Sequence, residues 1–128
     1  MVDARLYFID MLRAIYYCHN VVKVIHRDIK PENIMINHNN EAVLIDFGIS
    51  VLLDNTGEFD HNTIGTYTFY SPEMWDKKKQ RLLFQKEMND LWALGITFFK
   101  ILTGTYPWDE TESVMELREQ ILTKTIEF

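Results

Sequence analysis

The sequence predicts an α+β fold that is mainly α-helical and carries one small β-hairpin. Apolar residues recur every three or four places over residues 4–20, which is the period of an amphipathic helix. A strongly apolar helix is indicated over 89–103 and a further amphipathic one over 114–121. Two short β-prone runs flank an asparagine-rich turn before them, a pattern typical of a hairpin. Helices grouped around one hairpin and a long irregular segment are therefore expected.

Length and composition place the chain among globular proteins of one domain at most. The 128 residues are 47% hydrophobic and 25% charged, and 13 basic against 19 acidic residues give a formal net charge of −6. This acidic surplus argues against nucleic acid or an anionic membrane as the main partner, because both require a basic footprint. One cysteine, Cys18, excludes a disulfide framework and a four-cysteine zinc site.

Neither a membrane span nor a secretory leader is expected. The longest apolar run, residues 91–99, has nine residues, whereas a spanning helix needs about 20. The first ten residues contain Asp3, Arg5 and Asp10 in place of a basic start and an apolar run. We therefore expect a soluble protein of a reducing compartment, the cytoplasm.

The first expected helix runs from Ala4 to Asn20, where asparagine is a common helix end. Pro31 would break any helix, so residues 21–33 are expected to be irregular. The stripe that should face the core consists of Leu6, Ile9, Leu12, Ile15, Tyr16 and His19.

The expected hairpin pairs residues 33–36 with residues 42–45 around a turn at 37–41. Residues 46–72 have no sustained period and are rich in glycine and hydroxyl side chains. A loop of this length in a compact chain is uncommon and usually functional.

The strongly apolar helix is expected to open at Asn89-Asp90 and to stop at Gly104. The last helix lies in an acidic region, since residues 109–128 hold six acidic and two basic residues. Trp92, Phe98 and Phe99 are predicted to be core residues of the apolar helix, and Cys18 a small packed hydrophobe.

Four polar residues form the candidate site: Asp28, Lys30, Asn33 and Asp46. A tight hairpin returns the chain beside its start, so Asn33 and Asp46 should lie at one end of two paired strands. An amide and a carboxylate supply hard oxygen ligands, which suit Mg²⁺ bound to a phosphate. Asp28 is then placed to accept a proton from a hydroxyl, and Lys30 to stabilise a transferring phosphoryl group.

These residues stand in motifs that resemble those of protein kinases. His26-Arg27-Asp28-Ile29-Lys30-Pro31-Glu32-Asn33 resembles the catalytic loop of that family, and Asp46-Phe47-Gly48 resembles its magnesium-binding motif. Further resemblances follow in the family's order: Ser71-Pro72-Glu73 to the end of the activation segment, Asp90-Leu91-Trp92-Ala93-Leu94-Gly95 to the start of the central helix, and Leu102-Thr103-Gly104 through Pro107-Trp108 to its exit. The resemblance implies a protein-kinase-like fold, of which this chain is the mainly helical C-lobe.

The resemblance also implies roles. ATP and Mg²⁺ would be the cofactors, with Asp28 as catalytic base, Lys30 as a phosphate contact, and Asn33 and Asp46 as metal ligands. In the activation segment, Arg27 would grip a phosphate, Thr63 is the candidate phosphate acceptor, and Thr66 would bond near Asp28 and Lys30. Structural roles fall to His26 and Phe47, which would stack, to Asp90, which would hold the catalytic loop from below, and to Glu73.

Short strings of residues indicate which class of kinase the sequence resembles. A lysine two places after the catalytic aspartate, as at Lys30, is typical of serine/threonine kinases. The strings at residues 46–50, 62–66, 106–110 and 126–128 look similar to calcium/calmodulin-dependent protein kinase kinases. The expected partners are thus ATP and a protein with a serine or threonine acceptor. Calmodulin is suggested by the subfamily likeness alone, because no segment of this chain supports it.

The family's other parts are not found in the sequence. The five glycines are scattered without a Gly-x-Gly, and no strand-rich region precedes the first helix. We expect residues 1–128 to be a partial kinase domain that lacks the N-lobe and the final helices, including the arginine partner of Glu73. The alternative is a non-catalytic module that binds kinase partners through the acidic segment after Trp108, although retention of Asp28, Asn33 and Asp46 argues against it.

Overall fold

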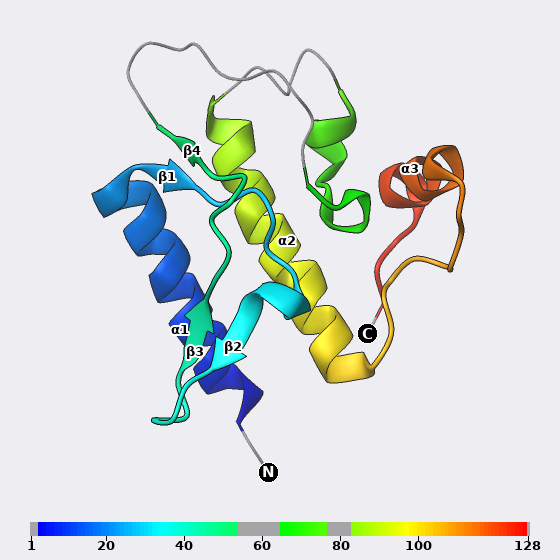
Figure 1. Cartoon of the computed structure of the whole chain (residues 1–128). Coiled ribbons are helices and arrows are strands. Elements are labelled where there is room, and N and C mark those ends of the chain that lie inside the picture. The colour runs from blue at the N-terminus through cyan, green and yellow to red at the C-terminus, as the bar shows by residue number, and fades with distance from the viewer. Residues whose placement is uncertain (1–2, 54–64, 77–82, 128) are drawn as a thin grey trace.

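The computed structural model describes residues 3–53, 65–76 and 83–127. Helix α2 (Leu83–Thr103) crosses the middle of the molecule, with α1 (Ala4–Tyr17) on one side and α3 (Val114–Thr123) on the other (Figure 1). Strands β2 (Ile34–Ile36) and β3 (Ala42–Leu44) form the hairpin, which packs on α1. No helix in the described ranges is long and apolar enough to cross a membrane. The mainly helical α+β architecture is as predicted.

The first helix begins where expected but ends differently. Asp3 caps α1 by accepting a hydrogen bond from the Arg5 backbone N–H at 3.1 Å. The predicted end at Asn20 is wrong, because the chain continues as a π-helical turn over Cys18–Val22 and leaves it at Lys23 with a left-handed φ of 61°. The side chain of Asn20 bonds back to the Tyr16 carbonyl, so it does not cap the end.

The buried face of α1 also differs from the prediction. Ile15 and His19 of the predicted stripe are buried, as is Met11 outside it, whereas the other four members are exposed, namely Leu6, Ile9, Leu12 and Tyr16. Apolar residues lie on more than one side of this helix, so periodicity alone did not select the inner face. The contacts with β3 and α2 selected it instead.

The hairpin forms with the predicted strands and turn. Its register pairs Ile34 with Leu44, Met35 with Val43 and Ile36 with Ala42. Alternation directs Ala42 and Leu44 into the core and leaves Met35 and Val43 exposed. The Asp10 carboxylate accepts a hydrogen bond from the Ala42 backbone N–H at 3.1 Å, which ties the hairpin to α1.

A second two-stranded sheet was not predicted. Strand β1 (Val24–Ile25) pairs antiparallel with β4 (Val51–Leu52), with Val24 opposite Leu52 and Ile25 opposite Val51. Strands of two residues are too short to show a period, and β4 lies in the segment expected to be irregular throughout. This sheet sets the chain after Asp46 beside the chain before Asp28.

Helix α2 begins at Leu83, six residues before the start predicted at Asn89. The helix was expected to open at Asn89 and Asp90, but both lie inside it and are buried. The Asn89 side-chain oxygen accepts a hydrogen bond from the Ser71 backbone N–H at 2.8 Å instead. The predicted stop is confirmed, because Gly104 has a φ of 81° and its N–H bonds to the Lys100 carbonyl.

The core is centred on α2. Trp92 and Trp108 stack with ring centroids 6.5 Å apart, and the Trp108 indole N–H donates to the Thr68 carbonyl at 3.1 Å. The segment leading to α3 is thereby tied to the chain before Ser71. The buried side chains of this core include Met11, Ile15, Ile29, Ala93, Leu94, Ile96, Phe98, Trp108 and Ile121.

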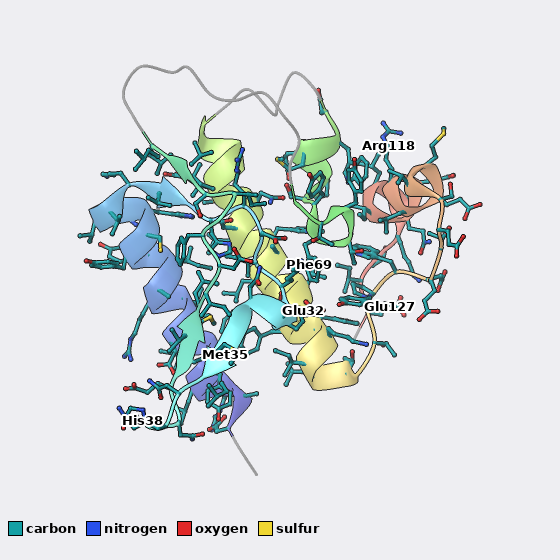
Figure 2. The ribbon with its side chains drawn as sticks, in the orientation of Figure 1. Glu32, Met35, His38, Phe69, Arg118 and Glu127 are labelled. Atoms are coloured by element: carbon teal, nitrogen blue, oxygen red, sulfur yellow. The ribbon has the colours of Figure 1, made fainter. Side chains whose placement is uncertain are left out.

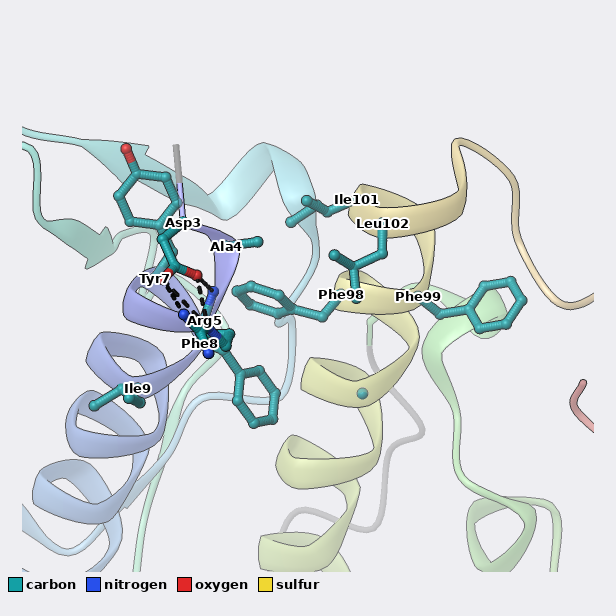
Figure 3. A pocket seen from close by; sticks show the side chains of 11 residues that line it. Asp3, Ala4, Arg5, Tyr7, Phe8, Ile9, Phe98, Phe99, Ile101 and Leu102 are labelled. Carbon is teal, nitrogen blue, oxygen red and sulfur yellow. Dashed lines mark hydrogen bonds and ion pairs between the residues drawn. The ribbon is translucent and has the colours of Figure 1, made fainter. Parts of the chain in front are cut away.

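An apolar groove of about 1040 Å³ lies between α1 and the C-terminal part of α2. Phe8 and Phe98 meet edge to face in it, with centroids 4.9 Å apart, and Ile101 and Leu102 line its α2 side (Figure 3). None of the predicted site residues lines this groove.

The inner face of α1 can be tested with two adjacent residues. Met11→Ala should lower the free energy of unfolding by about 2–5 kcal/mol, because Met11 is 0% exposed in the core. Leu12→Ala should cost about 1 kcal/mol or less, since Leu12 is 38% exposed. Urea unfolding followed by circular dichroism measures both free energies. A larger loss of stability in Leu12→Ala than in Met11→Ala would show that the face predicted from the sequence is the buried one.

Candidate active site

The site is built on the buried carboxylate of Asp90, which is 1% exposed in α2. One oxygen, Oδ2, accepts the His26 backbone N–H at 2.9 Å, and the other, Oδ1, accepts the Arg27 backbone N–H at 3.0 Å. Two adjacent backbone groups of one loop are therefore fixed to the central helix. The predicted position of Asp90 beneath this loop is what the structure has.

The His26 ring links the loop to the chain before Asp46. Its Nε2 lies 2.8 Å from the Ile45 carbonyl oxygen, and its Nδ1 accepts the Asp28 backbone N–H at 3.1 Å. A carbonyl only accepts, so Nε2 carries the proton and the ring is neutral. The Phe47 ring meets His26 edge to face at 4.7 Å, rather than in a parallel stack.

Two site residues hold left-handed backbone conformations. Arg27 has a φ of 72° and Asp46 a φ of 61°. Such conformations cost about 1–2 kcal/mol outside glycine, less for aspartate, and persist where surrounding contacts determine them. At Arg27 those contacts are the bond to Asp90 and a 2.6 Å bond from the Arg27 Nε to the Ile49 carbonyl.

The Asp28 carboxylate is held by three side chains. Its Oδ1 accepts from the Thr66 hydroxyl at 3.1 Å. Its Oδ2 lies 3.3 Å from the Asn33 amide nitrogen and 3.5 Å from the Lys30 ammonium. Lys30 also donates to the Thr66 oxygen at 3.3 Å, which closes the network. Asp28, Lys30, Asn33 and Thr66 are thus brought together as predicted.

Asn33 and Asp46 lie at the same end of the hairpin. The Ile45 N–H bonds to the Asn33 carbonyl at 2.9 Å, so Asp46 follows directly beyond the paired strands. Asn33 donates its amide N–H₂ to the Asp28 carbonyl at 2.7 Å, which leaves its side-chain oxygen directed away from that contact. The Asp46 carboxylate is exposed and accepts only the Gly48 N–H among the hydrogen bonds of the described residues.

This donor set fits a Mg²⁺ ion that is also held by a phosphate. One carboxylate and one amide oxygen are too few for a protein-only site but match a cation that completes its shell with phosphate and water. No group of three or more histidine, cysteine or acidic side chains in the described ranges is arranged to hold a metal by itself. The pair Asn33 and Asp46 is therefore the candidate metal position.

The segment at Gly65–Tyr70 closes over the loop. Gly65 has a φ of 123°, and a Cβ there would lie 2.7 Å from the Arg27 carbonyl oxygen. Burial raises the pKa of Tyr70 to about 12, so its phenol stays neutral. Tyr67 stacks on Trp75 at 5.7 Å, which joins this segment to the turn at Pro72–Trp75.

The remaining predicted residues are placed separately from the network. Glu73 is half-buried in the turn at Pro72–Trp75. The Arg27 side chain is half-buried against Ile49. Thr63 lies outside the described residues.

Sequence reasoning missed two features of this region. His19 was predicted only as a core-facing member of the first helix, yet its Nε2 lies 2.7 Å from the Asp90 carboxylate. Met35 and Val43 are directly paired in the hairpin and both are exposed, and Figure 2 shows Met35 on the hairpin. The alternation of the strand could have indicated Met35, whereas nothing in the sequence joins His19 to a residue 71 positions later.

Comparisons with known proteins support the resemblance found in the sequence motifs. The family model for the protein kinase domain matches residues 1–127. Mitogen-activated protein kinase kinase 2 of Arabidopsis thaliana is 37% identical over 123 residues, which cover 90% of this chain and 32% of the relative. The probable serine/threonine-protein kinase MARK-A of Dictyostelium discoideum is 35% identical over 94% of this chain and 11% of its own length.

A third relative, the G2-specific protein kinase fin1 of Schizosaccharomyces pombe, is 35% identical over 90% of this chain and 18% of its own length. The chain thus spans a third or less of the length of these curated relatives.

Two glycines test the close approach of Gly65 to the loop. Gly65→Ala should lower the free energy of unfolding by about 1–3 kcal/mol, because its φ and the Arg27 carbonyl both oppose a Cβ. Gly95→Ala should raise it by about 0.5–1 kcal/mol, because Gly95 is helical with nothing within 4 Å of the added carbon. Equal effects in a denaturant titration would contradict the close approach.

Proposed function

Because the chain belongs to the protein kinase domain family, we propose that it carries the catalytic loop of a serine/threonine protein kinase, which transfers the γ-phosphoryl group of ATP to a serine or threonine hydroxyl of a protein. The observation that carries this proposal is the closed network of Asp28, Lys30, Asn33 and Thr66, with Asp46 at the end of the adjoining hairpin.

Asp28 is the proposed catalytic base. Thr66 fixes one carboxylate oxygen, while Asn33 and Lys30 contact the other, so the group is oriented before a substrate arrives. A base held in this way accepts the proton of an acceptor hydroxyl as its oxygen attacks phosphorus. The bond to Thr66 also joins the base to the segment that follows Gly65.

Lys30 is the proposed contact of the transferring phosphoryl group. Its ammonium lies within reach of both Asp28 and Thr66 and is 26% exposed, so it remains accessible to a phosphate. A positive charge at this position stabilises the negative charge that develops during transfer.

Asn33 and Asp46 are the proposed Mg²⁺ ligands, through the amide oxygen and the carboxylate. When bound, the ion supplies neutralisation of phosphate charge. The left-handed backbone of Asp46 and its bond to the Gly48 N–H direct the carboxylate at the strand end. Met35 and Val43 offer an apolar surface beside this end, and we propose that the base of the nucleotide packs there.

The activation segment is proposed to be organised by phosphate. Arg27 supplies a guanidinium for a phosphate on Thr63, and Thr66 forms the contact with Asp28. Glu73 is the proposed partner of an arginine from the family's final helices. We propose that residues 1–128 are one part of a kinase domain.

The proposed substrate preference and subfamily rest on short sequence motifs. Serine/threonine preference is supported by Lys30 and by the name of the Dictyostelium discoideum relative, a probable serine/threonine-protein kinase. The likeness to calcium/calmodulin-dependent protein kinase kinases stays a prediction, since the three relatives described above bear other names. A partner set of ATP and protein substrate without nucleic acid or membrane is proposed from the acidic composition. A cytoplasmic location is proposed from the single cysteine, which excludes a disulfide framework.

Loss of the base tests the catalytic assignment. In the protein purified as its native gene encodes it, Asp28→Asn should lower kcat for transfer from ATP to a serine-containing protein by at least about 100-fold, because the amide cannot accept the proton. The initial rate of ³²P transfer measures this. Asp109→Asn is the control. The Asp109 carboxylate is exposed and pairs with Lys124, so this substitution should leave the rate unchanged. Unaltered transfer in Asp28→Asn would remove this residue from the reaction.

Nucleotide binding tests the metal assignment without turnover. Asp46→Asn should weaken ATP binding about 10–100-fold in the presence of Mg²⁺ and leave binding in EDTA nearly unchanged, because only the metal-linked contact is lost. Isothermal titration of the native protein gives both affinities, with Asn39→Ala on the exposed hairpin turn as the control. Absence of Mg-ATP binding in the native protein would favour the non-catalytic module instead.

A further inference from the structure

Helix α3 presents an apolar stripe on its outer face. Met115 is 81% exposed, and Val114 and Leu122 are exposed as well. Arg118 stands three residues after Met115 and four before Leu122, so it lies on the same face, and its aliphatic stem extends the apolar surface. The packing of α3 uses the opposite side of the helix, because Ile121 belongs to the buried core.

An acidic border runs beside this stripe. Glu116 and Glu119 lie one turn apart on α3, and Glu112 precedes the helix by two residues. All three residues are exposed. From Asp109 to the end of the chain six residues are acidic and two are basic, and one of the two, Lys124, pairs with Asp109 at 3.3 Å. The outer face of α3 therefore combines apolar side chains with a negative border.

Hydrogen bonds hold α3 and the segment before it in place. Ser113 caps the helix by accepting the Glu116 backbone N–H at 3.3 Å, and the Thr111 hydroxyl oxygen accepts the Ser113 N–H at 3.1 Å. The Gln120 side chain accepts the Asp109 backbone N–H at 2.7 Å and donates to the Asp109 carbonyl at 3.3 Å. A surface ordered in this way loses little conformational entropy when a partner binds.

The negative border limits which partners can cover the stripe. An anionic membrane or a nucleic acid would be repelled by these carboxylates. A second copy of the chain that met the same face across a two-fold axis would bring like charges together at the interface. A segment that carries lysine or arginine beside apolar residues is favoured instead, because its charges complement the border while its apolar residues cover Met115 and Leu122.

Helix α3 also lies beside the proposed acceptor site. It packs on the turns at Tyr67–Phe69 and Pro72–Trp75, on the other side of α2 from α1 (Figure 1). The first of these turns directly follows Thr66, whose hydroxyl donates to the Asp28 carboxylate at 3.1 Å. A protein bound to α3 is therefore held near the proposed catalytic base.

We propose that the outer face of α3 is a docking surface for the protein substrate, which binds it through a basic and apolar segment separate from the serine or threonine that is phosphorylated. Met115 and Leu122 receive the apolar residues of that segment. Its basic residues face Glu112, Glu116 and Glu119. The proposal rests on the proposed function, because it assigns a partner surface to the same reaction. Docking of this kind raises the local concentration of the acceptor and leaves the chemical step unchanged.

Fluorescence anisotropy tests the surface without turnover. The probe is a labelled amphipathic peptide of leucine and lysine, titrated with the native protein. Met115→Asp should weaken binding about 10-fold, because the substitution removes apolar contact area. Met115→Asp also makes the protein more acidic, so a purely electrostatic attraction would strengthen binding instead. Unchanged or stronger binding in Met115→Asp overturns the proposal, as does the absence of binding to the native protein.

Two charge reversals form a matched pair for the same titration. Glu119→Lys on α3 and Glu127→Lys beyond its end change the net charge equally, and both residues are exposed. Glu119→Lys should weaken binding about 3–10-fold and Glu127→Lys should leave it nearly unchanged, because only Glu119 lies on the acidic border. Equal weakening would contradict the proposal, since the probe would then respond to net charge alone.

Transfer kinetics test the link to the reaction. A short serine peptide and the same peptide tethered to the leucine and lysine segment are compared as substrates of the native protein. The tethered peptide should have a KM about 10-fold lower at equal kcat, and Met115→Asp should remove this difference without changing the KM of the short peptide. Equal KM values for the two peptides in the native protein overturn the docking role.

Failure of the proposed function gives a different result. If the native protein phosphorylates neither peptide, the proposed function fails and the role of α3 in substrate docking fails with it. Binding of the basic segment to α3 is still decided by the anisotropy titration, which requires no transfer of phosphate.

Discussion

The carboxylate of Asp90 is the contact on which the rest of the site depends. It is a buried charge in the central helix, and its desolvation is offset by donors from a side chain and from two consecutive backbone groups. Through these bonds the position of α2 determines the course of the loop at His26 and Arg27. The network around Asp28 is built on the loop so fixed, and therefore inherits its geometry from the helix.

Several residues of the site have strained backbone conformations. Arg27 and Asp46 are left-handed, and Gly65 has a positive φ against the Arg27 carbonyl. Arg27 is held by Asp90 of the central helix and Gly65 lies against the Arg27 carbonyl, whereas Asp46 directly follows the paired strands of the hairpin. Such an arrangement favours catalysis by position, because polar groups held rigidly do not have to reorganise when charge develops.

Features fixed by residues close together in the sequence were predicted correctly, whereas features that depend on distant residues were not. The hairpin and the juxtaposition of Asn33 with Asp46 were predicted correctly, because a short turn fixes them locally. The inner face of α1 was predicted wrongly at Leu12, since several faces of that helix are apolar. The predicted start of α2 was wrong because Asn89 and Asp90, which are residue types common at helix starts, lie inside the helix. Their side chains accept hydrogen bonds from Ser71 and from the loop.

The sequence by itself determined the elements with a local cause: three helices, the hairpin, the stop at Gly104, and the residue types of the candidate site in their order along the chain. Tertiary structure alone decided the pairing of β1 with β4, the depth of Met11, and the contact of His19 with Asp90. These depend on which surfaces meet across tens of residues, and the burial that selects among such pairings is a property of the packed molecule, not of any local segment.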